Sequence, residues 1–261
     1  MMNLMKKLLY ILPVLLVATS CSWFKLDNQE GWNASIEGKI IDSVTGEPVQ
    51  AEQGNPLTVY ELGWDNEVPQ NWAIKNNGTY KNALVFAGKY RMNTVNANYV
   101  ADPVEFTINK GSNTVDFKVT PFLRISDVNI TYDASGKKIN ATCTVEPAFP
   151  ADKVNLIGEV RLCVYTDRFV KYSYNNCSKD PGAVKQNLNP EKQTVSLSVD
   201  TQLAANVQEF QYTRPHYIRI SAIGGHYKNG ALDKTFNQGY YNYSGVYKLE
   251  NGVVTPVTDW E

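Results

Sequence analysis

The sequence has 261 residues, of which 43% are hydrophobic and 20% are charged, and its formal net charge at pH 7 is -1. This hydrophobic share supports a folded core and argues against global disorder. The near-zero net charge excludes the strongly basic surface that nucleic acids and anionic membranes attract.

The first 21 residues have the pattern of a bacterial lipoprotein signal. Lys6 and Lys7 precede an apolar run at 8–17, and small residues lead directly to Cys21. This is the order of a secretory signal, and the apolar run is too short to span a bilayer. We therefore expect residues 1–20 to be removed and Cys21 to carry the lipid that anchors the protein.

Residues 21–32 are polar and mixed, which is typical of a short tether between the lipid and the first domain. Lipoproteins of Bacteroidota-type bacteria often reach the outer face through acidic residues directly after the cysteine. Here Asp27 and Glu30 come later and follow Lys25. We expect a lipid anchor in the outer membrane with display on the cell surface, and the periplasmic face is the alternative.

Residues 33–120 are predicted to form a first all-β domain. Short apolar stretches of strand type are separated by turn residues, at 36–41, 57–62, 72–74, 79–80, 84–86, 90–92, 104–108 and 115–119. Asn77-Gly78 is the strongest turn signal and predicts a hairpin between 72–74 and 79–80. Short strands at this spacing, without an amphipathic helical run, favour a β-sandwich.

Residues 121–250 are predicted to form a second β-sandwich after a boundary at Thr120-Pro121. We expect strands at 123–132, 139–145, 154–165, 195–199, 218–222 and 246–249. The polar stretch at 172–190 is predicted to be a loop or lid, 202–209 a helical turn and 251–261 a C-terminal tail.

The stretch at 36–50, Ile-Glu-Gly-Lys-Ile-Ile-Asp-Ser-Val-Thr-Gly-Glu-Pro-Val-Gln, resembles the opening of carboxypeptidase-regulatory-like, transthyretin-type sandwich domains. The later features of that family match in the expected order, at 77–80 (Asn-Gly-Thr-Tyr) and 87–90 (Ala-Gly-Lys-Tyr). The stretch at 217–222 (Tyr-Ile-Arg-Ile-Ser-Ala) resembles a fibronectin type III or immunoglobulin-like fold, although its tyrosine is one position out of register for a tyrosine corner.

The two domains together, joined through 120–125 (Thr-Pro-Phe-Leu-Arg-Ile), resemble an uncharacterised family of two-domain Bacteroidota lipoproteins. The genes of that family lie beside Sus-type uptake pairs, which consist of a porin-like transporter and its glycan-binding lid protein. The resemblance implies an accessory lipoprotein that captures oligo- or polysaccharide at the cell surface. Its expected partners are the glycan, the transporter and the lid protein.

Glycan-binding sites use aromatic rings that stack on sugar faces, together with amides and carboxylates that bind hydroxyl groups. Such rings are candidates in two stretches. In the first, Trp64 lies in a polar, proline-bearing loop and Trp72 follows in a strand pattern. The second is the tyrosine-rich stretch that contains Tyr240, Tyr241 and Tyr243. Alternation would direct Tyr241 and Tyr243 to one face. Each of these rings could instead pack in a core, and Tyr172 and Tyr174 are weaker candidates.

The cysteines beyond Cys21 leave two alternatives open. Cys163 falls on the strand face opposite its aliphatic neighbours and could form a disulfide with Cys177, because an exported protein meets oxidising conditions. Equally, all three could be free thiols. Cys143 alternates with aliphatic residues and is predicted to be a buried free thiol.

The sequence contains no Gly-x-Ser-x-Gly elbow, no His-Glu-x-x-His and no Gly-rich phosphate loop. A carboxylate pair for glycoside cleavage stays open as an alternative, because its spacing is set in three dimensions. His216 and His226 are the only histidines, and the cysteines are scattered, so neither a metal site nor a cofactor is expected. We expect a non-catalytic binding protein without cofactors. The competing hypothesis is a structural lipoprotein that docks on the transporter complex without binding sugar, with the tyrosine-rich stretch as a protein interface.

Overall fold

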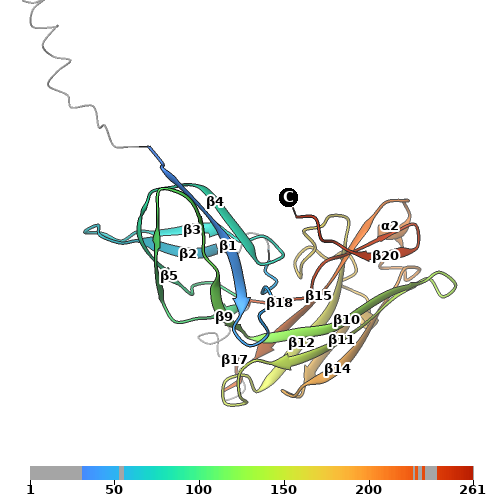
Figure 1. Cartoon of the computed structure of the whole chain (residues 1–261). Coiled ribbons are helices and arrows are strands. Elements are labelled where there is room, and N and C mark those ends of the chain that lie inside the picture. The colour runs from blue at the N-terminus through green and yellow to red at the C-terminus, as the bar shows by residue number, and fades with distance from the viewer. Residues whose placement is uncertain (1–30, 53–55, 226, 229–230, 233–239, 261) are drawn as a thin grey trace, which may run out of the picture.

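The computed structural model describes residues 31–52, 56–225, 227–228, 231–232 and 240–260. The predicted signal, Cys21 and most of the tether therefore lie outside the described residues. Within the described part, the protein is all-β apart from short helical turns, and its strands form several antiparallel and mixed sheets (Figure 1). None of the helices described there has the length and apolarity that a bilayer crossing requires.

The first half, residues 31–121, packs two sheets against each other. One sheet has the order β4 (Thr79–Val85), β1 (Ala34–Asp42), β9 (Phe117–Pro121) and β6 (Tyr99–Val100), with β8 (Gly111–Thr114) also paired to β1. The other has the order β3 (Pro69–Ala73), β2 (Pro56–Glu61), β5 (Gly88–Asn93) and β7 (Val104–Ile108).

The core of the first half lies between these sheets because alternate side chains of each strand point inward. Ile36 and Ile40 of β1 are buried there. So is an aromatic cluster in which the Tyr80 ring stacks on Phe117 with centroids 5.8 Å apart, and Phe117 meets Phe106 edge to face at 5.2 Å. The alternating apolar residues that predicted these strands are thus the residues that fill the core.

The second half, residues 122–260, repeats the plan with other strands. One sheet contains β10 (Leu123–Asp133), β11 (Lys138–Pro147) and β14 (Gln193–Asp200). The other has the order β13 (Val184–Leu188), β12 (Leu156–Tyr165), β15 (His216–Gly225), β19 (Tyr247–Glu250) and β20 (Val253–Pro256), with β18 (Asn242–Tyr243) paired to β15. The core residues come from both sheets, among them Val145, Leu162, Leu197 and Ile220.

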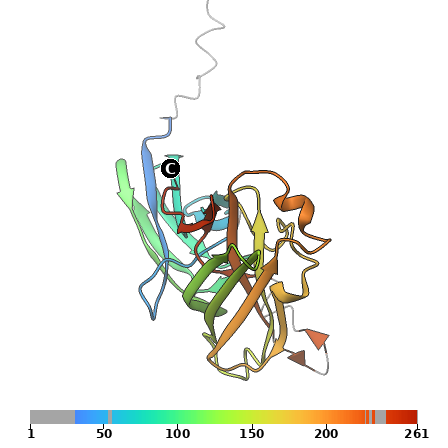
Figure 2. The same cartoon turned by 90° about the vertical axis from the view of Figure 1, so that its right-hand side faces the viewer.

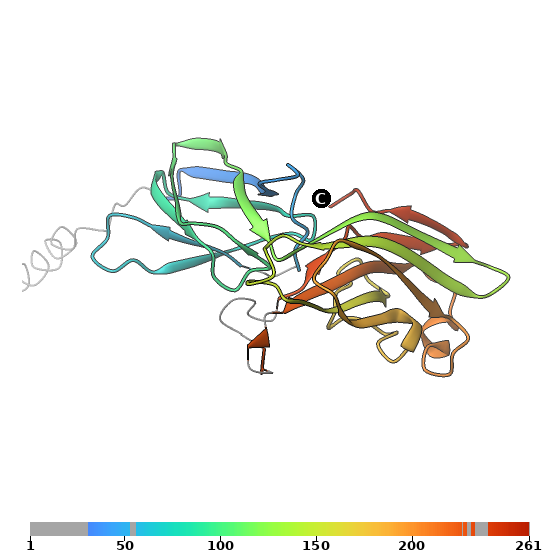
Figure 3. The same ribbon diagram turned by 90° about the horizontal axis from the view of Figure 1, so that it is seen from below.

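The remaining elements are short. A two-stranded sheet pairs β16 (Tyr227–Lys228) with β17 (Ala231–Leu232). A 3-10 turn, η1, spans Pro181–Ala183, and the one-turn helix α2 spans Val207–Phe210, inside the helical turn expected at 202–209. Figure 3 shows the two halves end to end, with α2 at the end of the molecule farthest from the first half.

Three local predictions need correction. The Asn76-Asn77-Gly78 turn exists, with φ of 77° at Gly78, and an antiparallel bridge pairs Ile74 with Tyr80 across it. The predicted hairpin goes no further than this bridge, because β3 pairs with β2 and β4 pairs with β1. The expected loop at 172–190 contains η1 and β13. The expected tail at 251–261 contains β20, which completes the sheet through β19.

A single residue, Phe122, separates β9 of the first half from β10 of the second, so no linker holds the halves apart. Side chains join them across the junction: Arg124 donates two hydrogen bonds to the Asp42 carboxylate, at 2.5 and 3.0 Å. In Figure 2, which looks from the side of the second half, the first half lies partly behind it and extends to its left.

The buried part of this junction is polar. Asn98 donates to the Tyr241 carbonyl at 3.1 Å, and Asn242 donates back to the Asn98 carbonyl at 2.8 Å. Arg219 of β15 is fully buried and donates to the carbonyl oxygens of Asn76 at 3.0 Å and Ser244 at 2.8 Å. Because buried polar groups are costly without partners, these reciprocal bonds tie the halves into one body.

Candidate functional site

Trp72 lies in the core of the first half. Its side chain is 5% exposed, its ring stacks with Tyr80 at 6.1 Å, and its indole N–H donates to Gln70 at 3.2 Å. A candidate role in sugar stacking does not fit this position, because the ring has no free face. The strand pattern in which Trp72 lies was the signal for packing.

Tyr243 is likewise buried, at 5% exposure. The Arg219 guanidinium lies 4.3 Å from the centre of its ring, and its hydroxyl donates to Glu52 at 3.0 Å. Burial, and then the nearby Glu52 carboxylate, raise the pKa of Tyr243. Tyr243 therefore belongs to the junction between the halves, and it does not fit the role of a surface platform.

Tyr241 and Tyr240 are both half-buried. The Tyr241 ring stacks on Tyr172 with centroids 4.1 Å apart and lies 6.4 Å from Tyr243. The Arg161 guanidinium also lies over the Tyr172 ring, 5.6 Å from its centre. Tyr172 is 40% exposed, but these contacts already engage its ring.

Tyr174 has the same arrangement. Its ring stacks on Tyr165 at 5.7 Å, and the Lys171 ammonium lies 4.5 Å from its ring centre. The tyrosine cluster around 165–174 and 240–243 is thus largely satisfied by its own contacts. It is a packed surface and not an open row of stacking platforms.

Trp64 is the most exposed of the predicted rings in the described part of the chain, ahead of Tyr174 at 49% and Tyr172 at 40%. Its side chain is 60% exposed in the connection between β2 and β3, and Val68 in the same connection is 68% exposed. An ion pair between Glu67 and Arg91 at 2.6 Å, with Arg91 lying over the Tyr60 ring at 5.4 Å, supports this segment from behind.

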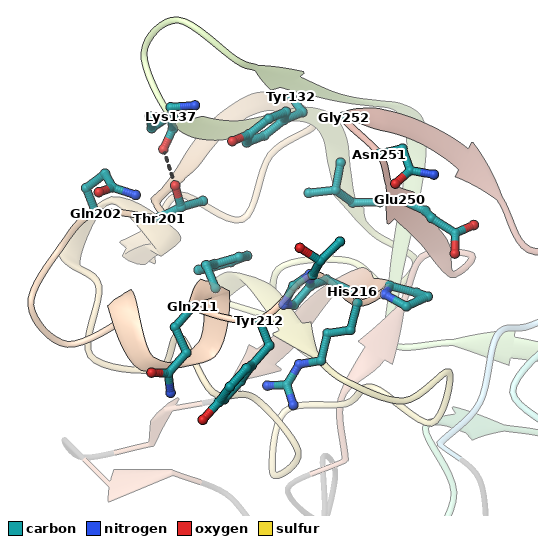
Figure 4. Close-up of a pocket in the computed structure, with 15 residues that line it drawn as sticks. Tyr132, Lys137, Thr201, Gln202, Gln211, Tyr212, His216, Glu250, Asn251 and Gly252 are labelled. Carbon is teal, nitrogen blue, oxygen red and sulfur yellow. Dashed lines mark hydrogen bonds between the residues drawn. The ribbon is translucent and has the colours of Figure 1, made fainter.

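A pocket of about 410 Å³ at the far end of the second half was not predicted. We call it the end pocket; its lining comes from the β10–β11 turn, the segment 201–216 and the β19–β20 turn. Figure 4 shows Tyr132 and Lys137 on one side of the opening, Gln211 and Tyr212 on the opposite side, and Glu250 and Asn251 on a third. Its volume lies within the range of small-ligand sites.

The β10–β11 turn is fixed by its own sequence. Asp133 accepts hydrogen bonds from the backbone of Ser135 and Gly136 at 3.0 and 2.9 Å, as aspartate does at turns. Lys137 follows with a φ of 54°, and its carbonyl accepts from the Thr201 hydroxyl at 2.8 Å (Figure 4). This bond holds the turn against the segment 201–216.

The β19–β20 turn is a two-residue hairpin loop. Asn251 and Gly252 both have positive φ, of 51° and 79°, which is the backbone pattern that Asn-Gly favours. The turn presents the Asn251 amide at the pocket edge.

The third wall is fixed by buried polar groups. Asn206 is fully buried and donates to the Asp180 carboxylate at 2.7 Å and to the Asp200 carbonyl at 2.8 Å. Asp180 also accepts the backbone N–H of Asp200 at 2.8 Å. These bonds position the segment that carries Gln202, Gln211 and Tyr212.

A buried carboxyl group contacts two lining residues of the pocket, Arg214 and His216, from outside the lining. Glu209 is buried and accepts from Arg214 at 3.2 Å and from Asn176 at 2.6 Å. His216 lies beside it, with its ring 4.6 Å from Phe210. Tyr212, by contrast, is 62% exposed at the rim.

Two other pockets formed by the described residues lack an exposed ring. A groove of about 320 Å³ along the junction is lined by the Asp42–Arg124 pair and by buried Tyr243. A depression of about 650 Å³ beside β1 has Tyr80 as its aromatic residue, and that side chain is 1% exposed. The end pocket therefore combines an exposed aromatic ring with convergent amides, which is the chemistry of a polar ligand site. Among the described residues, no cluster of His, Cys, Asp and Glu has the makings of a metal site.

Sequence reasoning missed Tyr212 because no local pattern marks it. Asn251-Gly252 was a usable signal, since it is the same hairpin dipeptide that was recognised at 77–78.

Cys143, Cys163 and Cys177 are buried free thiols. The disulfide between Cys163 and Cys177, one of the two alternatives, is therefore absent from the structure. The Cys163 sulfur instead lies 3.5 Å from the Ser221 hydroxyl, in a small cluster on the outer face of β12. The prediction that Cys143 is a buried free thiol is confirmed.

Comparison with known proteins gives a match to one protein family and matches to solved structures. Residues 34–120 match the model of a family described as "Protein of unknown function (DUF3823) N-terminal domain". No curated protein matches the sequence significantly.

Solved structures match over most of the chain. A Bacteroides uniformis protein named a "putative carbohydrate binding protein" is 27% identical, with a TM-score of 0.67, and the match covers 87% of this chain and 100% of that one. A DUF3823 family protein from Parabacteroides merdae is 21% identical, with a TM-score of 0.66, over 85% of this chain and 100% of that one. A DUF3823 family protein from Bacteroides ovatus is 21% identical, with a TM-score of 0.60, over 82% and 97%.

These matches confirm the expected all-β fold and extend it across both halves. Residues 34–120 thus match the DUF3823 N-terminal domain model, and the fold of the chain is similar to that of solved DUF3823 family proteins.

Proposed function

We propose that this protein binds carbohydrate in the end pocket, without catalysing a reaction. The observation that carries the proposal is Tyr212, a 62% exposed ring at the rim of a pocket whose other walls present Gln202, Gln211 and Asn251. Exposed aromatic rings stack on sugar faces, and amides both donate to and accept from hydroxyl groups. The similarity to a protein named as a carbohydrate binder supports the same reading.

We further propose the cellular setting that the sequence suggests. The protein would be anchored through lipid on Cys21, displayed at the cell surface, and associated with a Sus-type transporter and its lid protein. Its halves would be a transthyretin-like and an immunoglobulin-like sandwich. Replacing Cys21→Ala should release the protein from the membrane fraction; continued membrane association of that variant would refute the anchor.

The test of binding is affinity electrophoresis of the mature chain in gels that contain single polysaccharides. Wild type, Tyr212→Ala and Tyr174→Ala would run side by side. Tyr174 is a matched control because it is also an exposed tyrosine of the second half, but its ring faces are covered. We expect at least one polysaccharide to retard wild type and the control.

We expect Tyr212→Ala to bind that polysaccharide about ten-fold more weakly, which corresponds to about 1.4 kcal/mol. Circular dichroism would establish that the variant is folded. Equal retardation of Tyr212→Ala and wild type would remove the pocket from the proposal, and no retardation on any polysaccharide would remove carbohydrate binding.

A second function is favoured by a separate observation. Trp64 and Val68 form an exposed apolar tip on the first half, and exposed apolar groups of this kind mark contact sites for other proteins. The protein would then be a docking component of the transporter complex. Loss of co-purification with the transporter on Trp64→Ala, but not on Tyr212→Ala, would identify this role.

A further inference from the structure

We propose that the end pocket selects acidic sugars, whose carboxylate or sulfate group is bound by Lys137 and Arg214. This inference rests on the proposed function and specifies its ligand. It follows from a count of which charged groups around the pocket already have partners within the protein and which remain available.

The carboxylates near the pocket are engaged. Asp133 accepts from the backbone of its own turn, at 3.0 Å from Ser135. Asp200 accepts from the Gln202 backbone at 2.9 Å. At the rim, Glu250 pairs with Lys248 at 2.9 Å.

The buried carboxylate is engaged at one oxygen. Glu209 accepts hydrogen bonds from Arg214 and Asn176 at Oε2, while Oε1 has no hydrogen-bond partner in the described part of the chain and lies 3.5 Å from the His216 ring. Arg214 and Lys248 thus offset the charges of Glu209 and Glu250, and Asp133 and Asp200, which keep their charge, do not line the pocket.

The cations are not fully engaged. Lys137 lines the pocket and is exposed, and its ammonium has no hydrogen-bond or ion-pair partner among the described residues. Its backbone, by contrast, is held in place by the bond to Thr201. The chain thus fixes the base of a cationic side chain while leaving its charged end available.

Arg214 is half engaged. Both of its hydrogen bonds to Glu209 use Nη2, and in the described part of the chain Nε and Nη1 have no acceptor. A guanidinium presents five donors in a planar fork that matches carboxylate and sulfate groups. The pair with Glu209 therefore orients the fork and leaves one side of it free.

The free donors lie beside the stacking ring. The Arg214 guanidinium carbon is 5.8 Å from the centre of the Tyr212 ring. A sugar stacked on Tyr212 consequently brings an acidic substituent within reach of Nε and Nη1, while Lys137 faces it across the opening (Figure 4). Hydrogen bonds to charged groups are stronger than neutral ones, so an acidic sugar gains more in this pocket than a neutral sugar of the same shape.

The test compares matched polysaccharides that differ in charge, in the gels described above. The pairs are polygalacturonate against its methyl ester, and dextran sulfate against dextran, with xylan, galactan and starch as further neutral polymers. The first pair reports on carboxylate and the second on sulfate. Wild type, Lys137→Gln and Lys138→Gln would be run at low and at 0.5 M salt.

Lys138 is the matched control, because it is the next residue and equally exposed but does not line the pocket. We expect the acidic member of at least one pair to bind ten-fold or more tightly than its neutral partner. Lys137→Gln should weaken that binding about two- to five-fold at low salt, as exposed ion pairs do, and less at high salt. Lys138→Gln should bind as wild type does.

Three results would overturn the inference. Equal or tighter binding of the neutral polymers would refute charge selection while leaving carbohydrate binding intact. An acidic preference that Lys137→Gln does not reduce, or that Lys138→Gln reduces equally, would place the selectivity outside this pocket. Absence of binding to every polymer would remove the proposed function and this inference together.

Discussion

Replacing Arg219 with methionine tests whether the buried junction ties the two halves into one cooperative unit. The side chain is fully buried, and burial lowers the pKa of Arg219 to about 10, so it remains protonated at neutral pH. Methionine keeps most of its length and apolar volume but cannot donate to the carbonyl oxygens of Asn76 and Ser244. The change therefore removes one bond across the junction and one within the second half.

The expected loss can be worked from these contacts. Each hydrogen bond from a charged donor contributes about 1.5–3 kcal/mol to stability. The contact with the Tyr243 ring, 4.3 Å from the guanidinium, adds about 1–2 kcal/mol. Against this, Nη1 has no acceptor in the described part of the chain, and removing such an unpaired buried donor returns about 1–3 kcal/mol. We therefore expect a net loss of about 3–5 kcal/mol in the free energy of unfolding.

Differential scanning calorimetry measures this change directly. For a protein of this size, about 1 kcal/mol lowers Tm by about 2–4 °C, so Arg219→Met should lower Tm by about 6–20 °C. Wild type should unfold in a single transition, and the variant should show a broadened or divided one because the halves are less tightly coupled. Arg91→Met is the control, since Arg91 forms an exposed ion pair with Glu67 worth about 0.2–1 kcal/mol.

A Tm for Arg219→Met within about 2 °C of wild type would refute the reasoning, because it would mean a contribution below about 1 kcal/mol. Two separate unfolding transitions in wild type would also refute the reasoning, because the two halves would then unfold independently even with Arg219 in place.

Two further predictions follow from other contacts. Burial alone would raise the pKa of Asp42, but hydrogen bonds from Arg124 and the Val44 backbone outweigh it and hold the pKa below its ordinary value. A carboxylate whose pKa is lower in the folded state than in the unfolded state stabilises the protein above the unfolded pKa and loses that contribution as the pH falls. Asp42→Asn should therefore reduce the fall of Tm with pH below about pH 4. An unchanged slope of Tm against pH would contradict this. Trp72→Ala should lower the free energy of unfolding in urea by about 3–5 kcal/mol because it leaves a cavity in the aromatic core. Trp64→Ala should leave the urea midpoint unchanged, and a larger loss for Trp64→Ala than for Trp72→Ala would contradict the packing described.

The strands themselves were largely predictable because their signal is local. Ile36 and Ile40 alternate with polar residues, and that alternation alone predicts which side chains face the core. The same rule explains why Trp72, which lies in a strand pattern, packs in the core and is not available to stack on a sugar. Local pattern and burial agree wherever one face of a strand is covered by the other sheet.

Strand partners were less predictable, because pairing depends on residues far apart in the sequence. Gly78 fixes a tight reversal, but the reversal does not determine that β4 pairs with β1 while β3 pairs with β2. Such choices are made by the burial of whole sheet faces, and a local turn motif does not report on them.

The end pocket shows the same limit more sharply. Its walls come from turns near residues 134, 205 and 251, which the strand order of the second half brings to one end. The break between the strands predicted at 123–132 and 139–145 was identified from sequence, and the turn at Asn251-Gly252 could have been. That the two turns enclose a cavity with Tyr212 depends on three-dimensional arrangement alone.

The single-residue connection at Phe122 has a consequence for how this protein can be divided. The family match ends at residue 120, but a fragment that stops there loses the groups that satisfy its inner surface. Asp42 would lose Arg124, Asn98 would lose Asn242, and the Asn76 carbonyl would lose Arg219. The stretch that matches the family is therefore shorter than the part of the chain that satisfies these polar groups. A protein that combined the first half with a different second half would need new hydrogen-bond partners for Asp42, Asn98 and the Asn76 carbonyl.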